Sequence, residues 1–254
     1  MNNILRSIYL RLYLFLNPNN YLENRAKKAG YFENEIRFLP QLCDKDKISI
    51  DIGASKGTYS FHLLKFSKEV IAFEAFEKKY KELIYLFRRQ KNIKIENYAL
   101  SNKTEVEELR IPIEDTGRST LESSNKLAEI EGEVIIQSVK CRKLDDFNFK
   151  NIGLIKVDVE GHEEAVLSGS RKTIQRESPS LIIEIEERHK QDSINNVKSF
   201  LYDRGYTGFF YKNGKFYNIS HFDVIRDQSI NNEEYINNFI FIHESKINNL
   251  RDLF

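Results

Sequence analysis

The sequence has little cysteine, no long apolar run and almost no excess charge of either sign. Only two cysteines, Cys43 and Cys141, occur among 254 residues, and neither has a cysteine or histidine close by. That pattern excludes a disulfide-rich secreted scaffold and a zinc finger, and it favours the reducing cytoplasm as the location. No stretch approaches the roughly 20 apolar residues that span a bilayer.

The charges nearly cancel, because 39 basic and 38 acidic residues leave a net charge of +1. This balance gives the chain no global attraction to nucleic acid or to an acidic membrane, so we expect no nucleic-acid partner. The hydrophobic fraction of 41% is high enough for a sizeable core and excludes a wholly disordered chain.

Residues 4–16 are strongly apolar, but Arg6 and Arg11 interrupt them and no small-residue cleavage site follows. We therefore expect no signal peptide. The favoured interpretation is a helix packed on the main domain. The alternative is peripheral contact with the inner membrane face, where Arg6 and Arg11 would meet phospholipid headgroups. The predicted organisation is an N-terminal helical extension over 1–46, one domain over 47–246 and a C-terminal tail over 247–254.

From Lys47 onward, apolar β-branched runs alternate with helical segments. Strands are predicted over 47–52, 69–74, 93–98, 106–113, 134–139, 152–158, 181–185 and 239–243, and helices over 58–65, 77–89, 162–176 and 193–204. Residues 209–217 predict a hairpin with an Asn-Gly turn. This alternation predicts an α/β three-layer sandwich, whose ligand would lie beyond the carboxyl ends of the strands.

The first such end carries a glycine-bearing loop that begins with Asp51 and includes Gly53 and Gly57. Gly53 permits a tight turn, and Gly57 permits close approach of the helix backbone to a ligand. The loop is neither the three-glycine dinucleotide fingerprint nor a P-loop. A carboxylate just before the glycines suits a cationic ligand group better than a pyrophosphate.

The second strand ends at Glu74, where an acidic side chain can accept both hydroxyls of a ribose. A nicotinamide enzyme would share this glutamate but would also need the pyrophosphate glycines. Together with the first loop, Glu74 therefore indicates S-adenosylmethionine as the cofactor.

A third polar cluster, Asp158 to Glu164, ends another apolar strand. Crowded carboxylates acquire raised pKa values, as a general base requires, so Asp158 is the first candidate base, with Glu160 or His162 behind it. Asp158, Glu160 and His162 are alternatively ligands for a hard divalent cation, which leaves metal dependence undecided. Glu163 and Glu164 favour the helix N-terminus, and His62 and His189 are interpreted as structural or surface residues.

Four segments in order resemble the FkbM family of S-adenosylmethionine-dependent methyltransferases, namely Ile50–Gly57, Phe73–Ala75, Ala99–Ser101 and Ile155–Glu163. The resemblance runs from about Lys47 to His189, and Asp158-Val159-Glu160-Gly161-His162-Glu163 is its most specific part. Position 55 is Ser where the family frequently has Asn. The resemblance implies a class I methyltransferase fold, Rossmann-like, with a mostly parallel seven-stranded sheet and an antiparallel last strand. It also implies methyl transfer to oxygen, often a hydroxyl of a sugar or of a natural-product intermediate.

Carried over by position, the resemblance implies a binding role for each matching residue. The residues that would line the methionine end of the cofactor are Asp51, Gly53, Ala54 and Gly57, with Thr58 beside them. Asp51 would reach the ammonium directly or through water, and Glu74 would hold the ribose. The residues that would flank the adenine are Ala75 and Phe76 on one side and Ala99 and Leu100 on the other. Asp158 would lie beside the sulfonium and the acceptor.

The leading hypothesis is therefore an O-methyltransferase acting on a sugar or small-molecule hydroxyl, with surface glycan biosynthesis as the favoured setting. An RNA methyltransferase and a cofactor-binding partner protein without catalysis are the alternatives, and a nicotinamide dehydrogenase is disfavoured by the glycine pattern. The polar segment around Ser119-Thr120-Leu121 is either a lid over the acceptor or a plain surface loop.

Overall fold

The computed structural model describes residues 20, 21, 23, 24, 33–127, 132–229, 231, 232 and 234–250. The apolar segment 4–16, with its predicted helix and membrane contact, lies outside this set, as does most of the predicted N-terminal extension. Among the described residues, every helix is too short or too polar to cross a membrane.

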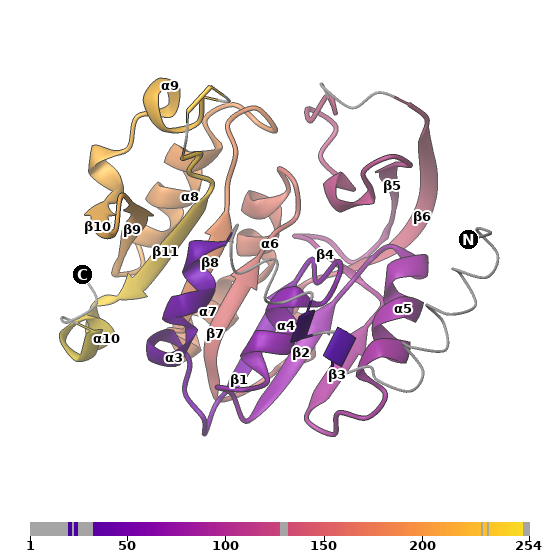
Figure 1. Cartoon of the computed structure of the whole chain (residues 1–254), viewed down its shortest axis with the longest axis horizontal. Coiled ribbons are helices and arrows are strands. Elements are labelled where there is room, and N and C mark those ends of the chain that lie inside the picture. Colours follow the sequence, from indigo (N-terminus) through magenta and orange to yellow (C-terminus); the bar gives the residue numbers. More distant parts are fainter. Residues whose placement is uncertain are drawn as a thin grey trace.

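A central sheet of eight strands, in the order β10-β9-β11-β8-β7-β1-β2-β3, organises the fold (Figure 1). The strands are β1 (Ile48–Ile52), β2 (Glu69–Phe73), β3 (Ile93–Glu96), β7 (Ile152–Val157), β8 (Ser180–Glu184), β9 (Tyr206–Lys212), β10 (Lys215–Asn218) and β11 (Asn238–His243). The β3-β2-β1-β7-β8 part is parallel, and β11 runs antiparallel to both β8 and β9. This is the class I methyltransferase-like α/β fold that the sequence predicts. The hairpin strand β10 extends the predicted seven strands by one, at the edge of the sheet.

Helices cover both faces of the sheet, so its central strands are buried on both sides. On one face lie α3 (Leu39–Leu42), α4 (Thr58–Leu63) and α5 (Glu77–Phe87), and on the other lie α6 (Glu163–Gly169), α7 (Arg171–Glu177) and α8 (Ser193–Tyr202). Side chains along β1 alternate accordingly, since Ile50 and Ile52 pack with the second group of helices. Asp51 therefore belongs to the face that α4 covers, together with Lys156, its register partner on β7.

The single helix predicted over 162–176 is in fact two, because α6 ends at Gly169 and α7 begins at Arg171. A Cβ on Gly169 would come within 2.0 Å of the carbonyl oxygen of Ser101, so the backbone of the helix end lies directly against the chain just after β4 (Ala99–Leu100). At the break, the Ser170 hydroxyl donates to the carbonyl oxygen of Val166, a bond that bends helices.

The predicted strands over 106–113 and 134–139 exist but do not join the central sheet. With β4 (Ala99–Leu100), β5 (Val106–Pro112) and β6 (Val134–Arg142) form a separate sheet in the order β4-β6-β5. The β5-β6 pair rises beside the carboxyl ends of the central strands (Figure 1). The segment between β5 and β6 is thereby placed next to the ligand-binding edge of the fold.

Short elements complete the described chain. They are η1 (Asn34–Phe38), η2 (Thr116–Arg118), η3 (Leu144–Phe147), η4 (Ile219–His221), α9 (Val224–Asp227), α10 (Glu244–Ile247) and η5 (Asn248–Leu250). Together, η1 and α3 contribute Ile36, Leu39 and Leu42 to the cluster that packs on α4. These residues of the predicted extension are thus part of the domain core.

Glu35 on η1 is a buried carboxylate whose pKa burial raises to about 7. Because the folded state holds this proton more tightly than the unfolded state, the resulting stability is present below pH 4.5 and lost as pH rises through 7. Between pH 5 and pH 8 we expect the wild type to lose about 2 kcal/mol of unfolding free energy through the ionisation of Glu35, and the variant Glu35→Gln should not show this loss. Urea unfolding at both pH values measures this. The exposed Glu82→Gln serves as the control, and equal pH slopes in wild type and Glu35→Gln would contradict the prediction.

Candidate active site

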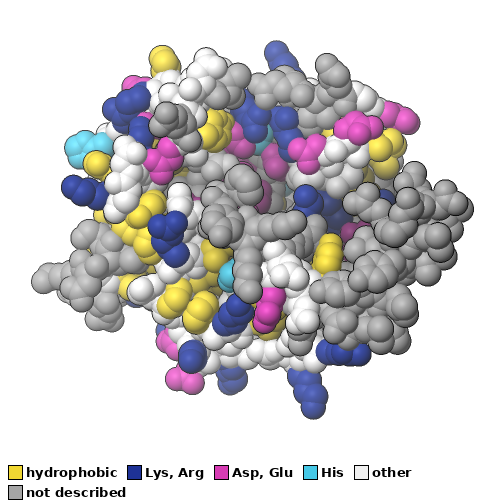
Figure 2. All heavy atoms as spheres, viewed as in Figure 1, with side chains coloured by type: hydrophobic (Ala, Val, Ile, Leu, Met, Phe, Trp, Pro, Cys, Tyr) yellow, Lys and Arg dark blue, Asp and Glu magenta, His cyan; other side chains and the backbone are white. Residues whose placement is uncertain are grey.

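A pocket opens where the strand order reverses, at the carboxyl ends of β1, β2 and β7. Figure 2 shows acidic, basic and histidine side chains gathered around a hollow in the upper half of this face. The sequence-predicted site residues that line the pocket are Gly53, Glu74, Ala75, Ala99, Leu100, Asp158 and His162. The loop after β1 and the strand-end residues Glu74 and Asp158 therefore meet in one place, as their positions in the sequence predict.

Gly53 lets the first loop lie directly against the end of β7. Its φ of 81° is in the left-handed region, and a Cβ there would come within 1.8 Å of the carbonyl oxygen of Asp158. No other residue type avoids both the strain and the collision. The close approach brings the loop after β1 and the Asp158 segment to the same side of the pocket.

Glu74 is held rigidly at the end of β2. Its two carboxylate oxygens accept backbone N–H bonds from Ser55, at 2.7 Å, and from Phe76, at 2.8 Å. Burial raises the pKa of Glu74, and the nearby Lys79 ammonium opposes that shift. Lys79 also lines the pocket and donates to the Ser55 hydroxyl, at 2.9 Å, and to the Thr116 carbonyl. It thereby ties the loop after β1 to the segment between β5 and β6.

Of the sequence-predicted site residues, the pocket lining leaves out the candidate base Glu160 and five of the predicted cofactor-binding residues, namely Asp51, Ala54, Gly57, Thr58 and Phe76. Asp51 is only 2% exposed, and it accepts a 2.5 Å hydrogen bond from the Ser60 hydroxyl on α4. Burial raises its pKa to about 6. From its position near the end of β1, the Asp51 side chain could either face the pocket or pack beneath a helix. In the structure it packs against α4. The cofactor contacts predicted for these five residues stay predictions.

Lys156 is a fully buried cation next to Asp158. Its ammonium lies 3.9 Å from an Asp158 oxygen and 3.7 Å from a Glu184 oxygen, and it donates at 3.0 Å to the side-chain carbonyl of Asn238. Burial alone would lower the pKa of Lys156, but Asp158 and Glu184 raise it. Lys156 therefore stays charged and fixes the position of the Asp158 carboxylate.

His162 also lines the pocket. Its Nε2 lies 2.9 Å from the hydroxyl of Ser101, and burial lowers its pKa to about 4. His162 is therefore neutral at physiological pH. Among the described residues, the close group of potential ligand atoms that includes Glu160 does not include Asp158 or His162, so the alternative set of Asp158, Glu160 and His162 stays a prediction.

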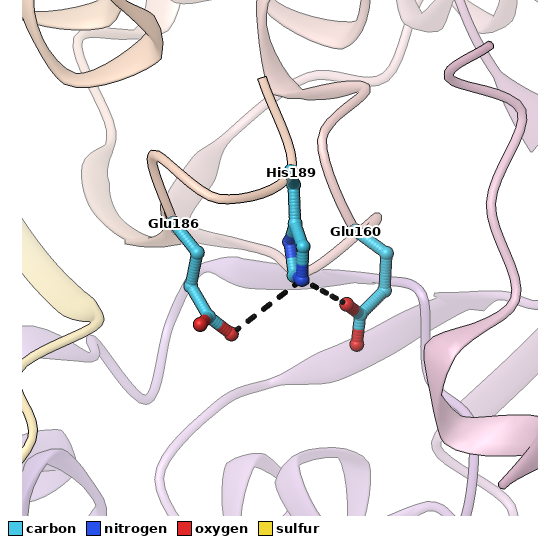
Figure 3. Close-up of side chains that lie close together, drawn as sticks. All are labelled: Glu160, Glu186 and His189. Carbon is cyan, nitrogen blue, oxygen red and sulfur yellow. Dashed lines mark ion pairs between the residues drawn. The ribbon is translucent and has the colours of Figure 1, made fainter. Parts of the chain in front are cut away.

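Within the described part of the chain, the group of three side chains that could hold a metal ion is Glu160, Glu186 and His189 (Figure 3). His189 Nε2 lies 3.3 Å from Glu160 Oε2 and 3.9 Å from Glu186 Oε1. Burial, with the carboxylates of Asp158 and Glu186, holds the pKa of Glu160 well above its usual value. Burial also lowers the pKa of His189 to about 4.

Sequence reasoning missed Glu186 and interpreted His189 as structural or a surface residue. His189 is 3% exposed and faces Glu160 across the site. A signal was available, since Glu184 to His189 is a polar cluster that follows the buried strand β8 as Asp158 to Glu164 follows β7. Because β7 and β8 are adjacent and parallel, the two clusters meet at the same edge.

Glu160 is locked in a left-handed conformation, with a φ of 54°. Its carbonyl oxygen accepts two side-chain hydrogen bonds, from the Thr120 hydroxyl at 2.7 Å and from the Asn125 amide at 2.9 Å. Ser119 and Leu121 line the pocket on either side of Thr120. The segment between β5 and β6 thus both walls the pocket and holds the turn that carries Glu160, rather than forming a plain surface loop.

Comparison with known proteins gives three findings. The family model described as the methyltransferase FkbM domain matches residues 51–207. No curated protein matches significantly. Among solved structures, methyltransferase FkbM from Methylobacillus flagellatus KT is 17% identical with a TM-score of 0.52, and the match covers 78% of this chain but 44% of that one.

Two further solved structures are less similar. An rRNA methylase from Streptococcus thermophilus is 12% identical with a TM-score of 0.47, and the match covers 84% of this chain and 95% of that one. TrmK of M. capricolum, solved with S-adenosyl-homocysteine, is 12% identical with a TM-score of 0.44 and coverages of 84% and 68%. These similarities concern the fold.

Proposed function

This chain belongs to the FkbM methyltransferase family, and from that premise we propose that it is an S-adenosylmethionine-dependent O-methyltransferase. The proposed acceptor is a hydroxyl group of a sugar or of another small molecule, and surface glycan biosynthesis is the proposed setting. The observation that carries the proposal is the shared pocket, in which Glu74 and Asp158 approach one cavity from the ends of two strands.

The residues around Glu74 fit the nucleoside part of the cofactor. Each carboxylate oxygen of Glu74 accepts one backbone bond and retains a second lone pair, so both can accept a ribose hydroxyl. Ala75, Ala99 and Leu100 give the same pocket apolar walls suited to an adenine ring. When bound, S-adenosylmethionine supplies a methyl group that its sulfonium has already activated.

The role of the protein is then to position the acceptor and to receive a proton. An alcohol hydroxyl is a weak acid, so it must lose its proton as its oxygen attacks. Asp158 lines the pocket, and its side chain is 31% exposed, so its carboxylate is accessible to an acceptor. Lys156 holds that carboxylate in place. We propose Asp158 as the base, and the pocket segment around Ser119 and Leu121 as one wall of the acceptor site.

The cofactor assignment predicts that Glu74→Ala weakens binding of S-adenosylhomocysteine by about 10- to 100-fold. The reason is the loss of hydrogen bonds to a charged group, worth about 1.5–3 kcal/mol each. Titration calorimetry of the purified protein measures the dissociation constant, with NAD titrated in parallel.

Glu77→Ala is the matched control, because Glu77 lies three residues after Glu74 but is exposed. Its carboxylate forms a surface ion pair with Lys81. Glu74→Gln retains much of the side-chain packing and separates loss of charge from loss of fold, which circular dichroism monitors. Tight binding of NAD without S-adenosylhomocysteine would overturn the assignment, as would equal affinities of wild type and Glu74→Ala.

The acceptor class is tested by methyl transfer from labelled S-adenosylmethionine to a panel of sugars, nucleotide sugars and an RNA transcript. We expect label on a sugar hydroxyl, in a product that resists mild acid and base as a methyl ether does. Label on the RNA transcript would overturn the proposed sugar acceptor and support the alternative, an RNA methyltransferase. Cofactor binding with no turnover on any acceptor would support a non-catalytic partner protein instead.

A further inference from the structure

A second cluster of chemistry-bearing side chains lies beside the proposed base. Glu160 follows β7, whereas Glu186 and His189 follow β8, so the parallel pairing of these strands brings them together (Figure 3). One potential ligand atom from each lies within 4.8 Å of the other two. Ligand atoms that share one ion at about 2.1 Å lie roughly 3–4 Å apart, so a small contraction of the cluster would accommodate an ion.

Two of these ligand atoms lack the partners that buried polar atoms normally have. Glu160 Oε2 and His189 Nε2 are both buried, and neither makes a hydrogen bond to any described residue. The side chain of His189 is 97% buried, and its Nε2 points at Glu160 (Figure 3). An unsatisfied buried polar atom costs about 1–3 kcal/mol. A cation between them would accept a lone pair from each and remove both costs.

The third potential ligand, the Glu186 carboxylate, is oriented toward the same point. Glu186 Oε2 accepts bonds of 2.5 Å from both the Arg188 guanidinium and the Tyr235 hydroxyl. Arg188 also donates at 3.1 Å to Oε1, the oxygen that faces His189. Partners that hold a ligating carboxylate in one orientation are typical of metal sites.

The turn that carries Glu160 is shaped to admit His189. Gly161 has a φ of 103°, and a Cβ on it would come within 3.1 Å of the His189 Cβ. The absence of a side chain at position 161 therefore allows the imidazole to lie against the turn. Thr120 and Asn125 fix the same turn from the other side.

The charges around the cluster also favour a cation. Around Glu160 and the nearby Glu184, carboxylate side chains outnumber the cationic side chains that interact with them electrostatically. The carboxylates are Asp158, Glu160, Glu163, Glu184 and Glu186, and the cations are Lys156, Arg118 and Arg188. A divalent ion would offset the repulsion among these carboxylates in their ionised forms.

We propose that Glu160, Glu186 and His189 bind a divalent metal ion. Two carboxylates with one imidazole suit Mn²⁺ or Zn²⁺ better than Mg²⁺, which prefers oxygen ligands alone. Three protein ligands leave positions open for water or for an acceptor oxygen. A role of the metal ion in binding the acceptor next to Asp158 rests on the proposed function, whereas the binding of the metal ion itself does not.

The test is Mn²⁺ binding to the full chain after treatment with a chelator, measured by electron paramagnetic resonance and by calorimetry. We expect His189→Gln and Glu160→Gln each to weaken binding by roughly 100-fold or more, since loss even of a residue that only orients a ligand costs 10- to 100-fold. The nitrogen coupling of the bound Mn²⁺ signal should disappear in His189→Gln.

Two variants control for charge and for the rival ligand set. Glu164→Gln removes a nearby carboxylate that pairs with Lys190 outside the cluster, and it should leave Mn²⁺ affinity unchanged. His162→Gln should retain both the affinity and the nitrogen coupling. Each variant is checked for its thermal melt and for binding of S-adenosylhomocysteine, which reports an intact fold and cofactor site.

The outcomes separate this proposal from the proposed function. In one outcome, the wild type is folded and binds S-adenosylhomocysteine but binds neither Mn²⁺ nor Zn²⁺. That result would overturn the metal site and leave the methyltransferase assignment intact. Loss of Mn²⁺ binding in His162→Gln but not in His189→Gln would also overturn it. Mn²⁺ binding that depends on His189, without S-adenosylhomocysteine binding, would support the site and overturn the cofactor assignment.

Discussion

Replacing Asp158 with asparagine is expected to lower kcat by roughly 100- to 10,000-fold, the range that general-base catalysis contributes. The amide keeps the shape of the side chain and can still line the pocket, but it cannot accept the proton of the acceptor hydroxyl. Because Asp158 would act as the acceptor attacks, affinity for S-adenosylhomocysteine should change little. Steady-state kinetics on the acceptor identified by the panel, together with calorimetry, measures both quantities.

Two controls sharpen this test. Asp203→Asn makes the same chemical change at an exposed position on the far end of α8 and should retain full activity. Asp158→Asn should also retain Mn²⁺ binding, since Asp158 is outside the group of potential ligands. Near wild-type turnover by Asp158→Asn, with unchanged cofactor affinity, would show that Asp158 is not the base.

Replacing Lys156 with methionine is expected to lower the free energy of unfolding by about 3–5 kcal/mol near pH 7. That is the usual cost of removing one partner from a buried ion pair. Lys156 is the cation between Asp158 and Glu184, and it also satisfies the side-chain oxygen of Asn238. Methionine matches its length but leaves both carboxylates uncompensated. Urea unfolding, followed by circular dichroism, measures the loss.

The loss should shrink as the pH falls from 8 to 5. Burial and Asp158 already hold the pKa of Glu184 well above its usual value, and Lys156 opposes that shift. Without the lysine, the folded-state pKa rises further, so the variant gains stability by protonation as the pH drops and loses it as the pH rises. The exposed Lys68→Met serves as the control. An equal deficit at both pH values would indicate a packing defect rather than an uncompensated charge.

The sequence predicted most of the fold, because strand burial and helix periodicity are local signals. The runs that became β1, β2, β7 and β8 are largely apolar and almost fully buried, and such runs are typical of a central parallel sheet. Pairing partners are not local. The strands β5 and β6 were therefore recognised as strands, but their separation from the central sheet was not.

The site divides along the same line. Glu74 and Asp158 could be predicted, because a polar residue at the end of a buried strand is visible in one segment. The positions of Asp51 and His189 could not, since each depends on a distant element. Asp51 packs on Ser60 of α4, and His189 meets Glu160 only because β7 and β8 are neighbours.

The two side-chain bonds from Thr120 and Asn125 to the Glu160 carbonyl have a consequence for how this scaffold diversifies. The segment between β5 and β6 joins two strands at the rim of the pocket, so exchanging it would be a direct way to reshape the pocket wall. Such an exchange would not be modular. A grafted segment without equivalent donors would release Glu160 from its left-handed turn, so the pocket wall and the proposed metal ligand would change together.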